Sequence, residues 1–472
     1  MEKKHIFLFI IVFVILFLLV YSPHSSNHFP LHVDEWHHIH ESINLRNGDY
    51  NFSSSSFRIG FQLFLAGLSF FISLVKFYFI FPAIWAVFSG LVLAVLVYKK
   101  TENIWISLLS VFFFASIKSN VNLGGLWFFT SLTFSIPFIF AFIYFFSEGL
   151  EKENKKSILL SFLIIVLLIP THIISFSFAI PFLFIYSFIY FKFIKREWKF
   201  FSMFLLIPFI SFIFFNFILR IKHNFILKFF NAMSFKYGWG VLELNNSFLE
   251  VYSLIGFLFA IVGFFVFLFS KRKHLIYLIW PVVILFSIFF YRIFHISFFA
   301  PYQRNMFYFV LAMPFLSARG FYFVIKKINI FLIKHSFSKR FAKLILYLII
   351  FVLLFGSLMN YFVIPKGLEV YYPINQNQFE ALNFLKNQPQ GIVIVPIMQG
   401  DGVFPISGHR VFSSIYFYNR NNKRINKEFF YTTCPRKNEI IKLNNISYVF
   451  SNSPINCGWK KIYNKTSFIY NV

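Results

Sequence analysis

The chain has 472 residues, of which 58% are hydrophobic and only 13% are charged. This balance excludes an ordinary soluble globular protein and predicts a polytopic membrane protein. The formal net charge of +27 would suit a nucleic-acid-binding protein, but the basic residues gather in short clusters between apolar segments. Such clusters are typical of cytoplasmic loops that obey the positive-inside rule. The expected partner is therefore the lipid bilayer, and nucleic acid is not expected.

The first hydrophobic segment, residues 6–21, predicts a transmembrane helix. Glu2, Lys3 and Lys4 precede it, which predicts a cytoplasmic N-terminus. No small-residue cleavage site follows the segment, so we interpret it as an uncleaved anchor and not as a signal peptide.

The basic clusters assign the remaining spans. They lie at 99–100, 152–156, 192–199, 271–273 and 326–343. Placing all five in the cytoplasm predicts spans near 79–98, 104–119, 127–146, 157–171, 172–192, 199–219, 250–270, 275–291, 305–325 and 343–364. With the first span these make about eleven, each near the roughly 20 residues that a bilayer requires. We therefore expect a multi-pass protein of the plasma membrane with an extracytoplasmic C-terminus.

One apolar stretch, residues 59–75, does not fit this count. It is long enough to span, yet counting it would reverse the side of every later loop. We place it in the outer interface or as a re-entrant helix. The alternative is a tight helical hairpin that turns at Lys76, which would make twelve spans.

The sequence outside the predicted spans falls into a few outer segments and a long tail. The outer loops are 23–57, 118–127, 220–249 and 292–303. This predicts a transmembrane domain over 1–364 and a small extracytoplasmic α/β domain over 365–472.

The tail has its own pattern of predicted elements. A helix is expected at 376–387, and β-runs at 392–397, 410–418 and 446–451. Two polar, turn-like stretches, 400–402 and 407–410, are assigned no chemistry.

Both cysteines of the chain, Cys434 and Cys457, lie in the tail. An oxidising outer compartment would permit one disulfide between them, and two unpaired thiols are the alternative.

An acidic pair, Asp34 and Glu35, opens the first outer loop of a chain that has only 17 acidic residues. The run 34–47 has helical spacing with Trp36 and Ile39 on one side. Acids at a helix start can simply satisfy free N–H groups. A carboxylate at the edge of the hydrocarbon, however, loses solvation and becomes fit to take a proton from a hydroxyl. We therefore treat these two carboxylates as candidate catalytic residues.

Four histidines, His32, His37, His38 and His40, surround Asp34 and offer ligands for a divalent metal such as zinc. Their spacing matches no metal-binding signature. Histidines at a polar membrane interface usually pack or form hydrogen bonds, so we expect no metal and no other cofactor.

One span precedes an outer loop that opens with Asp34, Glu35 and Trp36, and a helix ending in Asn-Gly-Asp leads to a long run of further spans. This layout resembles the GT-C superfamily of polyprenyl-phosphate-dependent membrane glycosyltransferases. This superfamily includes protein O-mannosyltransferases, aminoarabinose transferases of lipid A and the catalytic subunits of oligosaccharyltransferases. The resemblance covers nearly the whole chain. It implies that Asp34, with Glu35 beside it, is the first-loop acid that faces the substrate.

The resemblance also suggests donor-phosphate residues. Residues 302–306 open a late span and are similar to the place where the family has an outer-facing arginine that meets the lipid phosphate. This implies that Arg304 binds the donor phosphate, with Arg292 and His295 nearby. A planar, permanently charged guanidinium suits a phosphate leaving group. An arginine that only anchors the helix end at the interface is the alternative.

Further candidates for substrate binding are His37, His172, Tyr237 and Trp239. His172 resembles a recurrent histidine at an outer junction between two spans, although a hydrogen-bonding cap between helices explains it as well. Tyr237 and Trp239 lie beside glycines in the third outer loop, where they would stack on a sugar or form an interfacial aromatic belt.

The chain departs from the oligosaccharyltransferase pattern in two places. Those subunits carry an acidic motif in the next outer loop and use it to hold a divalent metal, whereas residues 119–127 contain no carboxylate. The tail also lacks their Trp-Trp-Asp motif. Both differences favour metal-independent transfer of a single sugar over transfer of a whole oligosaccharide.

The expected function is therefore inverting transfer of a sugar from a polyprenyl-phosphate donor to a glycan, lipid or protein acceptor on the outer face. Asp34 would accept the proton of the acceptor hydroxyl, Glu35 would orient the acceptor or tune Asp34, and Arg304 would stabilise the departing phosphate. One alternative is a polysaccharide polymerase or ligase that uses a lipid-linked glycan. The other is a transporter or flippase, which the scarcity of ionisable residues within the spans disfavours.

Overall fold

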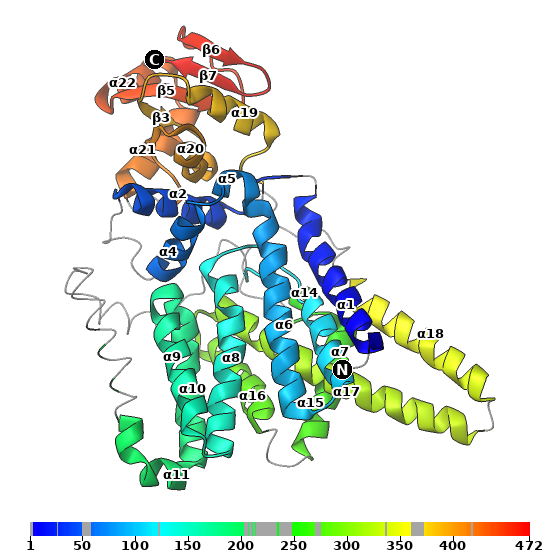
Figure 1. The fold of residues 1–472 in the computed structure, drawn as a ribbon. Coiled ribbons are helices and arrows are strands. Elements are labelled where there is room, and N and C mark those ends of the chain that lie inside the picture. The colour runs from blue at the N-terminus through cyan, green and yellow to red at the C-terminus, as the bar shows by residue number, and fades with distance from the viewer. Residues whose placement is uncertain are drawn as a thin grey trace. The chain divides into compact units, whose positions relative to one another are not determined.

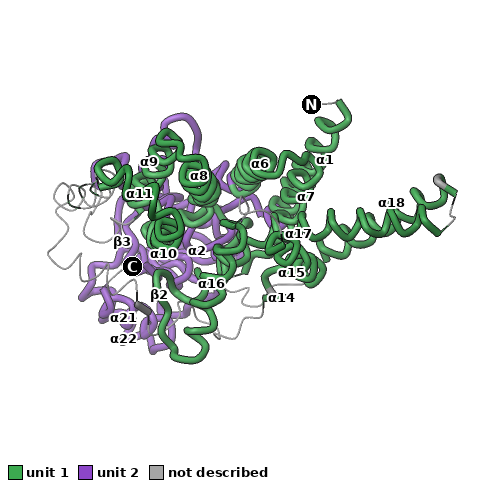
Figure 2. Tube along the Cα trace, turned by 90° about the horizontal axis from the view of Figure 1, so that it is seen from below, with its two compact units in different colours: residues 1–22, 56–60, 82–366 green, residues 23–55, 61–81, 367–472 purple. Residues whose placement is uncertain are grey.

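Two compact units make up the computed structural model. Unit 1 comprises Met1–Ser22, Ser56–Gly60 and Pro82–Lys366, and unit 2 comprises Pro23–Ser55, Phe61–Phe81 and Gly367–Val472 (Figure 2). The structure describes residues 3–25, 27–49, 58–120, 123–202, 206, 210, 213, 234–235, 248–269, 275–335, 338–359, 372–416 and 419–472. Unit 1 thus ends close to the predicted boundary at 364, and unit 2 joins the tail to most of the predicted first loop.

Unit 1 consists of helices with one small sheet (Figure 1). The helices are α1 (Lys3–Tyr21), α6 (Phe81–Thr101), α7 (Ile104–Ala115), α8 (Ser131–Glu151), α9 (Lys155–Thr171), α10 (Ile173–Ile189), α11 (Phe191–Arg196), α14 (Phe248–Val251), α15 (Leu254–Leu268), α16 (Leu275–Phe294), α17 (Tyr302–Lys334) and α18 (Lys339–Ser357). The sheet pairs β1 (Ser234–Phe235) with β2 (Ser297–Phe298) in antiparallel fashion.

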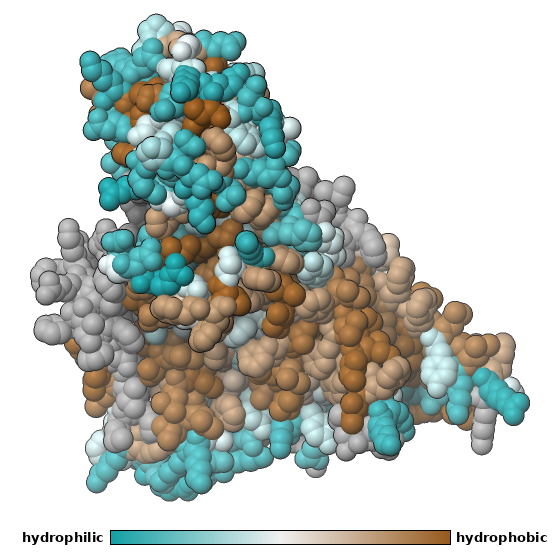
Figure 3. Space-filling view, turned by 45° about the horizontal axis from the view of Figure 1, so that its top comes forward, coloured by the Kyte–Doolittle hydropathy of each residue, from teal (hydrophilic) through white to brown (hydrophobic). Residues whose placement is uncertain are grey.

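The predicted polytopic helical architecture is confirmed. Among the described residues, six stretches of helix are long and apolar enough to cross a bilayer: Lys3–His24, Leu74–Thr101, Ser131–Glu151, Leu275–Phe294, Tyr302–Lys334 and Arg340–Ser357. Figure 3 shows a broad hydrophobic surface over the helices, as expected of helices that face lipid. The exposed apolar side chains of the helices include Phe7, Phe184 and Phe351. The count of eleven spans stays a prediction, and the predicted span at 199–219 lies largely outside the described residues.

Two glycines allow α15 and α17 to cross at close range. A Cβ atom on Gly263 would lie 1.9 Å from the carbonyl oxygen of Leu316, and one on Gly320 would lie 2.0 Å from that of Phe259. The obstacles are backbone atoms, which side-chain rotation cannot move away. Small residues at helix crossings are the usual means of packing helices within a membrane.

The stretch 59–75 forms the short helices α4 (Ile59–Leu68) and α5 (Leu74–Phe77). Ten residues of α-helix extend about 15 Å, which is half of the hydrocarbon thickness. Helix α4 is therefore too short to cross the membrane by itself. The alternative, a helical hairpin that turns at Lys76, is wrong about where the chain turns, because Lys76 lies within α5.

The tail in unit 2 forms the small α/β fold that the sequence predicts. Its sheet has the strand order β4-β3-β5-β7-β6, in which β3 runs parallel to β4 and β5, and β7 runs antiparallel to β5 and β6. The strands are β3 (Ile392–Ile394), β4 (Arg410–Val411), β5 (Ile446–Ser451), β6 (Lys460–Asn464) and β7 (Phe468–Asn471). The helices of the tail are α19 (Gln376–Leu385), α20 (Gly400–Ser407), α21 (Arg420–Tyr431) and α22 (Cys434–Leu443).

Two of the predicted β-runs are too long. The run at 392–397 ends early because Pro396 starts a 3-10 turn at Ile397–Gln399. In the described part of the run at 410–418, only Arg410–Val411 form a strand, since the chain then leaves the sheet. The residues that follow β4 instead form a loop, which becomes important for the candidate site.

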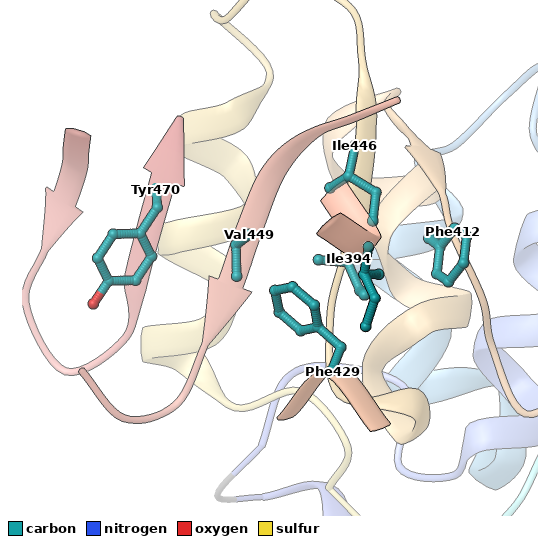
Figure 4. Close-up of a cluster of buried hydrophobic side chains, with 7 residues drawn as sticks. Ile394, Phe412, Phe429, Ile446, Val449 and Tyr470 are labelled. Atoms are coloured by element: carbon teal, nitrogen blue, oxygen red, sulfur yellow. The ribbon is translucent and has the colours of Figure 1, made fainter. Parts of the chain in front are cut away.

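A compact hydrophobic core holds the tail together (Figure 4). It joins side chains from the sheet with others from α21 and α22: Ile394, Phe412, Phe429, Ile440, Ile446, Val449 and Tyr470. A disulfide between Cys434 and Cys457, with Cα atoms 5.3 Å apart, ties the start of α22 to the segment before β6. The disulfide that the sequence permits is therefore present.

Candidate functional site

The first loop of the chain forms the predicted helix, α2 (Val33–Asn47), in unit 2. Its start is capped reciprocally: the Nδ1 atom of His32 accepts the backbone N–H of Asp34 at 3.1 Å, and Glu35 reaches back in return. The Oε2 atom of Glu35 accepts the backbone N–H groups of Leu31 at 2.7 Å and His32 at 3.0 Å. The Glu35 side chain is fully buried. The geometry thus gives Glu35 the helix-capping contacts that the sequence offers as the alternative to catalysis.

Asp34 is in a different position from its neighbour. Its side chain is 20% exposed, and its Oδ1 atom accepts a hydrogen bond from the hydroxyl of Tyr416 in the loop after β4. The Nδ1 atom of His32 lies 3.6 Å from the same oxygen. Among the described residues, no hydrogen bond reaches the second oxygen, Oδ2. One carboxylate oxygen is therefore fixed while the other remains available.

His37 lies one turn further along α2 and contacts two residues of the tail. Its ring stacks on Tyr416 with the centroids 4.3 Å apart and the planes inclined by 24°. Its Nδ1 atom lies 3.5 Å from Oδ1 of Asp401 in α20. Asp401 is buried, and the same oxygen accepts the hydroxyl of Ser414 at 3.0 Å. The other oxygen of Asp401 is buried without a hydrogen-bond partner in the described part of the chain.

Glycines on both sides of Asp401 allow α20 to approach its neighbours. A Cβ atom on Gly400 would lie 2.6 Å from the carbonyl oxygen of Ser413. One on Gly402 would lie 2.0 Å from the Cδ1 atom of Ile374 and 3.4 Å from the ring of Trp36. The stretch 400–402, to which the sequence assigned no chemistry, is thus the place where the tail packs against α2 within unit 2.

His40 follows on the same side of α2. Its Nδ1 atom is buried, and its ring lies 5.0 Å from that of Phe404 in α20. Burial lowers the pKa of His40 to about 4, although the charge of Asp401 opposes the shift. His40 is therefore neutral at physiological pH and acts as a packing residue.

In unit 1, Arg304 lies in the first turn of α17. Its Nη1 atom donates a hydrogen bond to the carbonyl oxygen of Leu123, at 2.6 Å, in the second predicted outer loop. Gly124 and Gly125 have φ angles of +77° and +130°, which only glycine adopts easily. A Cβ atom on Gly125 would also lie 2.4 Å from the hydroxyl of Ser119. The two glycines therefore shape the turn that holds Arg304.

His172 caps the start of α10, as the alternative in the sequence analysis proposed. Its Nδ1 atom contacts the hydroxyl of Ser175 at 2.7 Å, and that hydroxyl contacts Tyr308 at 3.0 Å. The buried ring also interacts electrostatically with Arg304 and Arg58. Arg58 is not among the residues that the motifs of the sequence indicate. Its one signal in the sequence is that no other lysine or arginine occurs between Arg46 and Lys76.

Arg292 and His295 lie at the end of α16, so they flank the same short connection as Arg304. The Nε atom of Arg292 donates a hydrogen bond to the hydroxyl of Tyr302 at 2.9 Å, and His295 is exposed with its ring 6.1 Å from that of Tyr291. The two other predicted substrate-binding residues, Tyr237 and Trp239, lie outside the described residues.

The four histidines that surround Asp34 in the sequence do not converge on one point. His32 caps the helix, His37 stacks on Tyr416, His38 packs edge-on against Phe61 and His40 packs near Phe404. In the described part of the chain, no group of three or more His, Cys, Asp or Glu side chains is placed to hold a metal ion. Independence from metal stays a prediction.

Neither a protein-family model nor a curated protein sequence matches the chain. Solved structures do match it. The apo oligosaccharyltransferase of Archaeoglobus fulgidus is 13% identical with a TM-score of 0.61, and the match covers 96% of this chain and 70% of that one. Oligosaccharyltransferase AglB of the same organism, in complex with an inhibitory peptide and a dolichol-phosphate, is 13% identical with a TM-score of 0.58 over 95% and 69%. ArnT from Cupriavidus metallidurans, bound to undecaprenyl phosphate, is 10% identical with a TM-score of 0.59 over 98% and 97%.

The chain therefore has the fold of these membrane glycosyltransferases over nearly its whole length, and the predicted GT-C-like fold is confirmed. Identities of 10–14% establish the fold and leave the activity to be argued from the residues.

Proposed function

We propose that this protein transfers a sugar from a polyprenyl-phosphate donor to a hydroxyl group of an acceptor at the outer face of the plasma membrane. The observation that carries the proposal is Asp34, whose Oδ1 atom is held by Tyr416 and whose Oδ2 atom has no hydrogen bond from the described residues, in a chain with this fold. Two of the structures with the same fold contain dolichol-phosphate or undecaprenyl phosphate, which supports a lipid phosphate as the carrier.

Asp34 is the proposed general base. Its available Oδ2 atom accepts the proton of the acceptor hydroxyl while the hydroxyl oxygen attacks the anomeric carbon. The bond from that carbon to the phosphate oxygen breaks, and the polyprenyl phosphate takes the bonding electrons. Attack opposite the leaving group inverts the anomeric configuration.

Arg304 is the proposed partner of the leaving phosphate. A guanidinium that is already fixed by the carbonyl of Leu123 neutralises the departing charge with little reorganisation. Arg58 adds a second positive charge, since Arg58 and Arg304 both interact electrostatically with His172. Arg292 and His295, at the end of α16, are further candidates for contacts to the phosphate.

Glu35 has a supporting part in this proposal. Its carboxylate is occupied by the N–H groups of Leu31 and His32, so it fixes the start of α2 and with it the position of Asp34.

Metal independence and the outer location also belong to the proposal. The separate packing of the four histidines around Asp34 and the absence of a carboxylate from 119–127 support a reaction without a divalent ion. The disulfide of the tail supports an oxidising, extracytoplasmic compartment for that domain.

The test is a panel of radiolabelled sugars on dolichyl and undecaprenyl phosphate, offered to the purified full-length protein in liposomes with a membrane extract as acceptor source. We expect transfer of one sugar per acceptor site from at least one donor, undiminished by EDTA. Transfer abolished by EDTA would overturn metal independence, and growth of a polymer would indicate a polymerase. No transfer from any donor would contradict the proposed activity.

A further inference from the structure

We infer that Tyr416 is a positioning residue for the base, so that the C-terminal domain contributes to the chemistry and not only to acceptor binding. The inference rests on the proposed function, in which Asp34 is the base. It concerns a residue 382 positions away from Asp34 in the sequence, within a stretch predicted to be a plain strand.

The loop that carries Tyr416 is fastened along its length. The backbone N–H of Phe412 donates to Val393 in β3 at 2.9 Å, and the hydroxyl of Ser414 donates to Asp401 at 3.0 Å. The Nζ atom of Lys423 in α21 donates to the carbonyl oxygen of Ile415 at 2.5 Å. A loop fixed at three successive points presents the next side chain in a defined direction, which an incidental surface contact does not require.

The ring of Tyr416 is also fixed. The imidazole of His37 stacks on one of its faces, and Asp401 orients that imidazole through its Nδ1 atom at 3.5 Å. Asp401 is itself buried and anchored by Ser414. Helix α2 and the loop after β4 are far apart in the sequence but contact each other directly through His37 and Tyr416. They are also linked through Asp401, which contacts both His37 and Ser414.

This arrangement has a chemical consequence for Asp34. A phenol that donates to Oδ1 fixes the rotation of the carboxylate, directs Oδ2 away, and stabilises the charged form that a base requires. The other ionisable groups around Asp34 are His32 and Glu35 at the start of α2, His37 one turn later, and Tyr78, which interacts with it electrostatically. In the described part of the chain, Tyr416 is the group whose hydroxyl bonds directly to the Asp34 carboxylate.

The first experiment does not depend on enzymatic activity. Dicyclohexylcarbodiimide modifies protonated carboxyl groups, and mass spectrometry localises the label on Asp34 in the full-length protein in nanodiscs. Tyr416→Phe keeps the ring on His37 and removes only the hydroxyl. We expect the pH midpoint of Asp34 labelling to rise by about one unit in this variant. The matched control is Tyr431→Phe, since Tyr431 is 85% exposed in the same domain and should leave the midpoint unchanged.

An unchanged midpoint in Tyr416→Phe would overturn the inference. If this variant does not accumulate as folded protein, Ser414→Ala removes the uncharged hydroxyl that anchors the loop of Tyr416 on Asp401 and should shift the midpoint in the same direction. No shift with Ser414→Ala would then overturn the inference.

The second experiment measures sugar transfer by the same variants. Tyr416→Phe should lower kcat about tenfold and move the acidic limb of its pH profile to higher pH, with the KM of the donor nearly unchanged. Loss of transfer in Asp34→Asn but wild-type kcat and pH profile in Tyr416→Phe would refute the positioning role only. Full transfer by Asp34→Asn would instead refute the proposed function, and the labelling result would then stand by itself.

Discussion

Two groups of candidate residues are built from different elements: the positive group, Arg304 and Arg58 with His172, in unit 1, and the carboxylate group, Asp34 with Tyr416, His37 and Asp401, in unit 2. The positive group of unit 1 uses residues at helix ends and short turns, where Arg304 is held by the backbone of Leu123 and His172 caps its own helix. The carboxylate group of unit 2 joins α2 to α20 and to the loop after β4, through contacts between residues more than 360 positions apart. The first group depends on the packing of helices within unit 1, since the contact of Arg304 with Leu123 joins residues 181 positions apart, whereas the second group requires a folded tail.

This difference predicts different sensitivities. The positive group should depend on the close packing of the helices in unit 1. The carboxylate group should depend on the disulfide of unit 2, on the protonation state of His40 and on the hydrophobic core of the tail. The following changes separate these dependencies, beginning with the largest expected effect.

The close crossing of α15 and α17 is the most demanding feature of unit 1. Gly320→Leu would place a side chain against the carbonyl oxygen of Phe259, which lies only 2.0 Å from the Cβ position. We expect loss of folded protein, because separating the two backbones costs more than about 3 kcal/mol. Size-exclusion profiles and yield in detergent measure this effect. Gly67→Leu is the control, since a Cβ atom there meets nothing within 4 Å, and a normal yield of Gly320→Leu would contradict the described crossing.

Arg304→Ala removes the fixed guanidinium of the positive group. We expect kcat/KM for the lipid-linked donor to fall about 100-fold, or roughly 2.7 kcal/mol, because the leaving phosphate loses a preorganised donor. Steady-state kinetics in liposomes gives this value. Arg340→Ala, an exposed arginine at the start of α18 in the same unit, should retain wild-type kinetics. Equal losses in both variants would indicate a general charge effect.

The disulfide should stabilise only unit 2. It closes a loop of 23 residues, for which its removal in the double variant Cys434→Ser and Cys457→Ser costs about 3 kcal/mol. Hydrogen exchange followed by mass spectrometry should show faster exchange in β5 and β7 and unchanged exchange in α15 and α17. Equal acceleration in both units would mean that the disulfide has a wider effect than this structure suggests.

Acid should weaken unit 2 through His40. Its pKa of about 4 in the folded protein is below the usual value of 6.5, so the unfolded chain binds more protons between these pH values. Stability is therefore full above pH 6.5 and falls as the pH decreases towards 4, by about 2 kcal/mol at pH 5. Exchange rates of α2 and α20 peptides at pH 7.5 and 5 measure the loss after correction for intrinsic rates. His40→Leu should reduce it, and an identical loss in that variant would assign it to other groups.

The same difference decides what the sequence could predict. Helix α2, its acidic start and most apolar helices of unit 1 follow from local patterns: residues 34–47 have helical spacing, and basic clusters separate the apolar segments. The strand at Ile446–Ser451 follows from its β-branched and aromatic residues in the same way.

The partners of Asp34 do not follow from any local pattern. Tyr416 lies in a stretch whose composition suggests a strand, and only the contact of Ser414 with Asp401 reveals that the chain leaves the sheet there. Asp401 occurs in a Gly-Asp-Gly turn-like sequence, whose glycines are explained by the close approach of α20 to Ile374 and Ser413. These contacts depend on tertiary packing between segments that are distant in the sequence. No short stretch of the sequence indicates them.

The measurement that tests the central claim most directly is single-turnover sugar transfer by Asp34→Asn, with donor binding shown to be intact. Asp49→Asn is the matched control, because Asp49 is an exposed acid just beyond the end of the same helix. If Asp34 is the base, Asp34→Asn should transfer at least about 100-fold more slowly than the wild type, and Asp49→Asn should transfer at the wild-type rate. Transfer by Asp34→Asn at the wild-type rate would contradict the assignment of the base to the first loop.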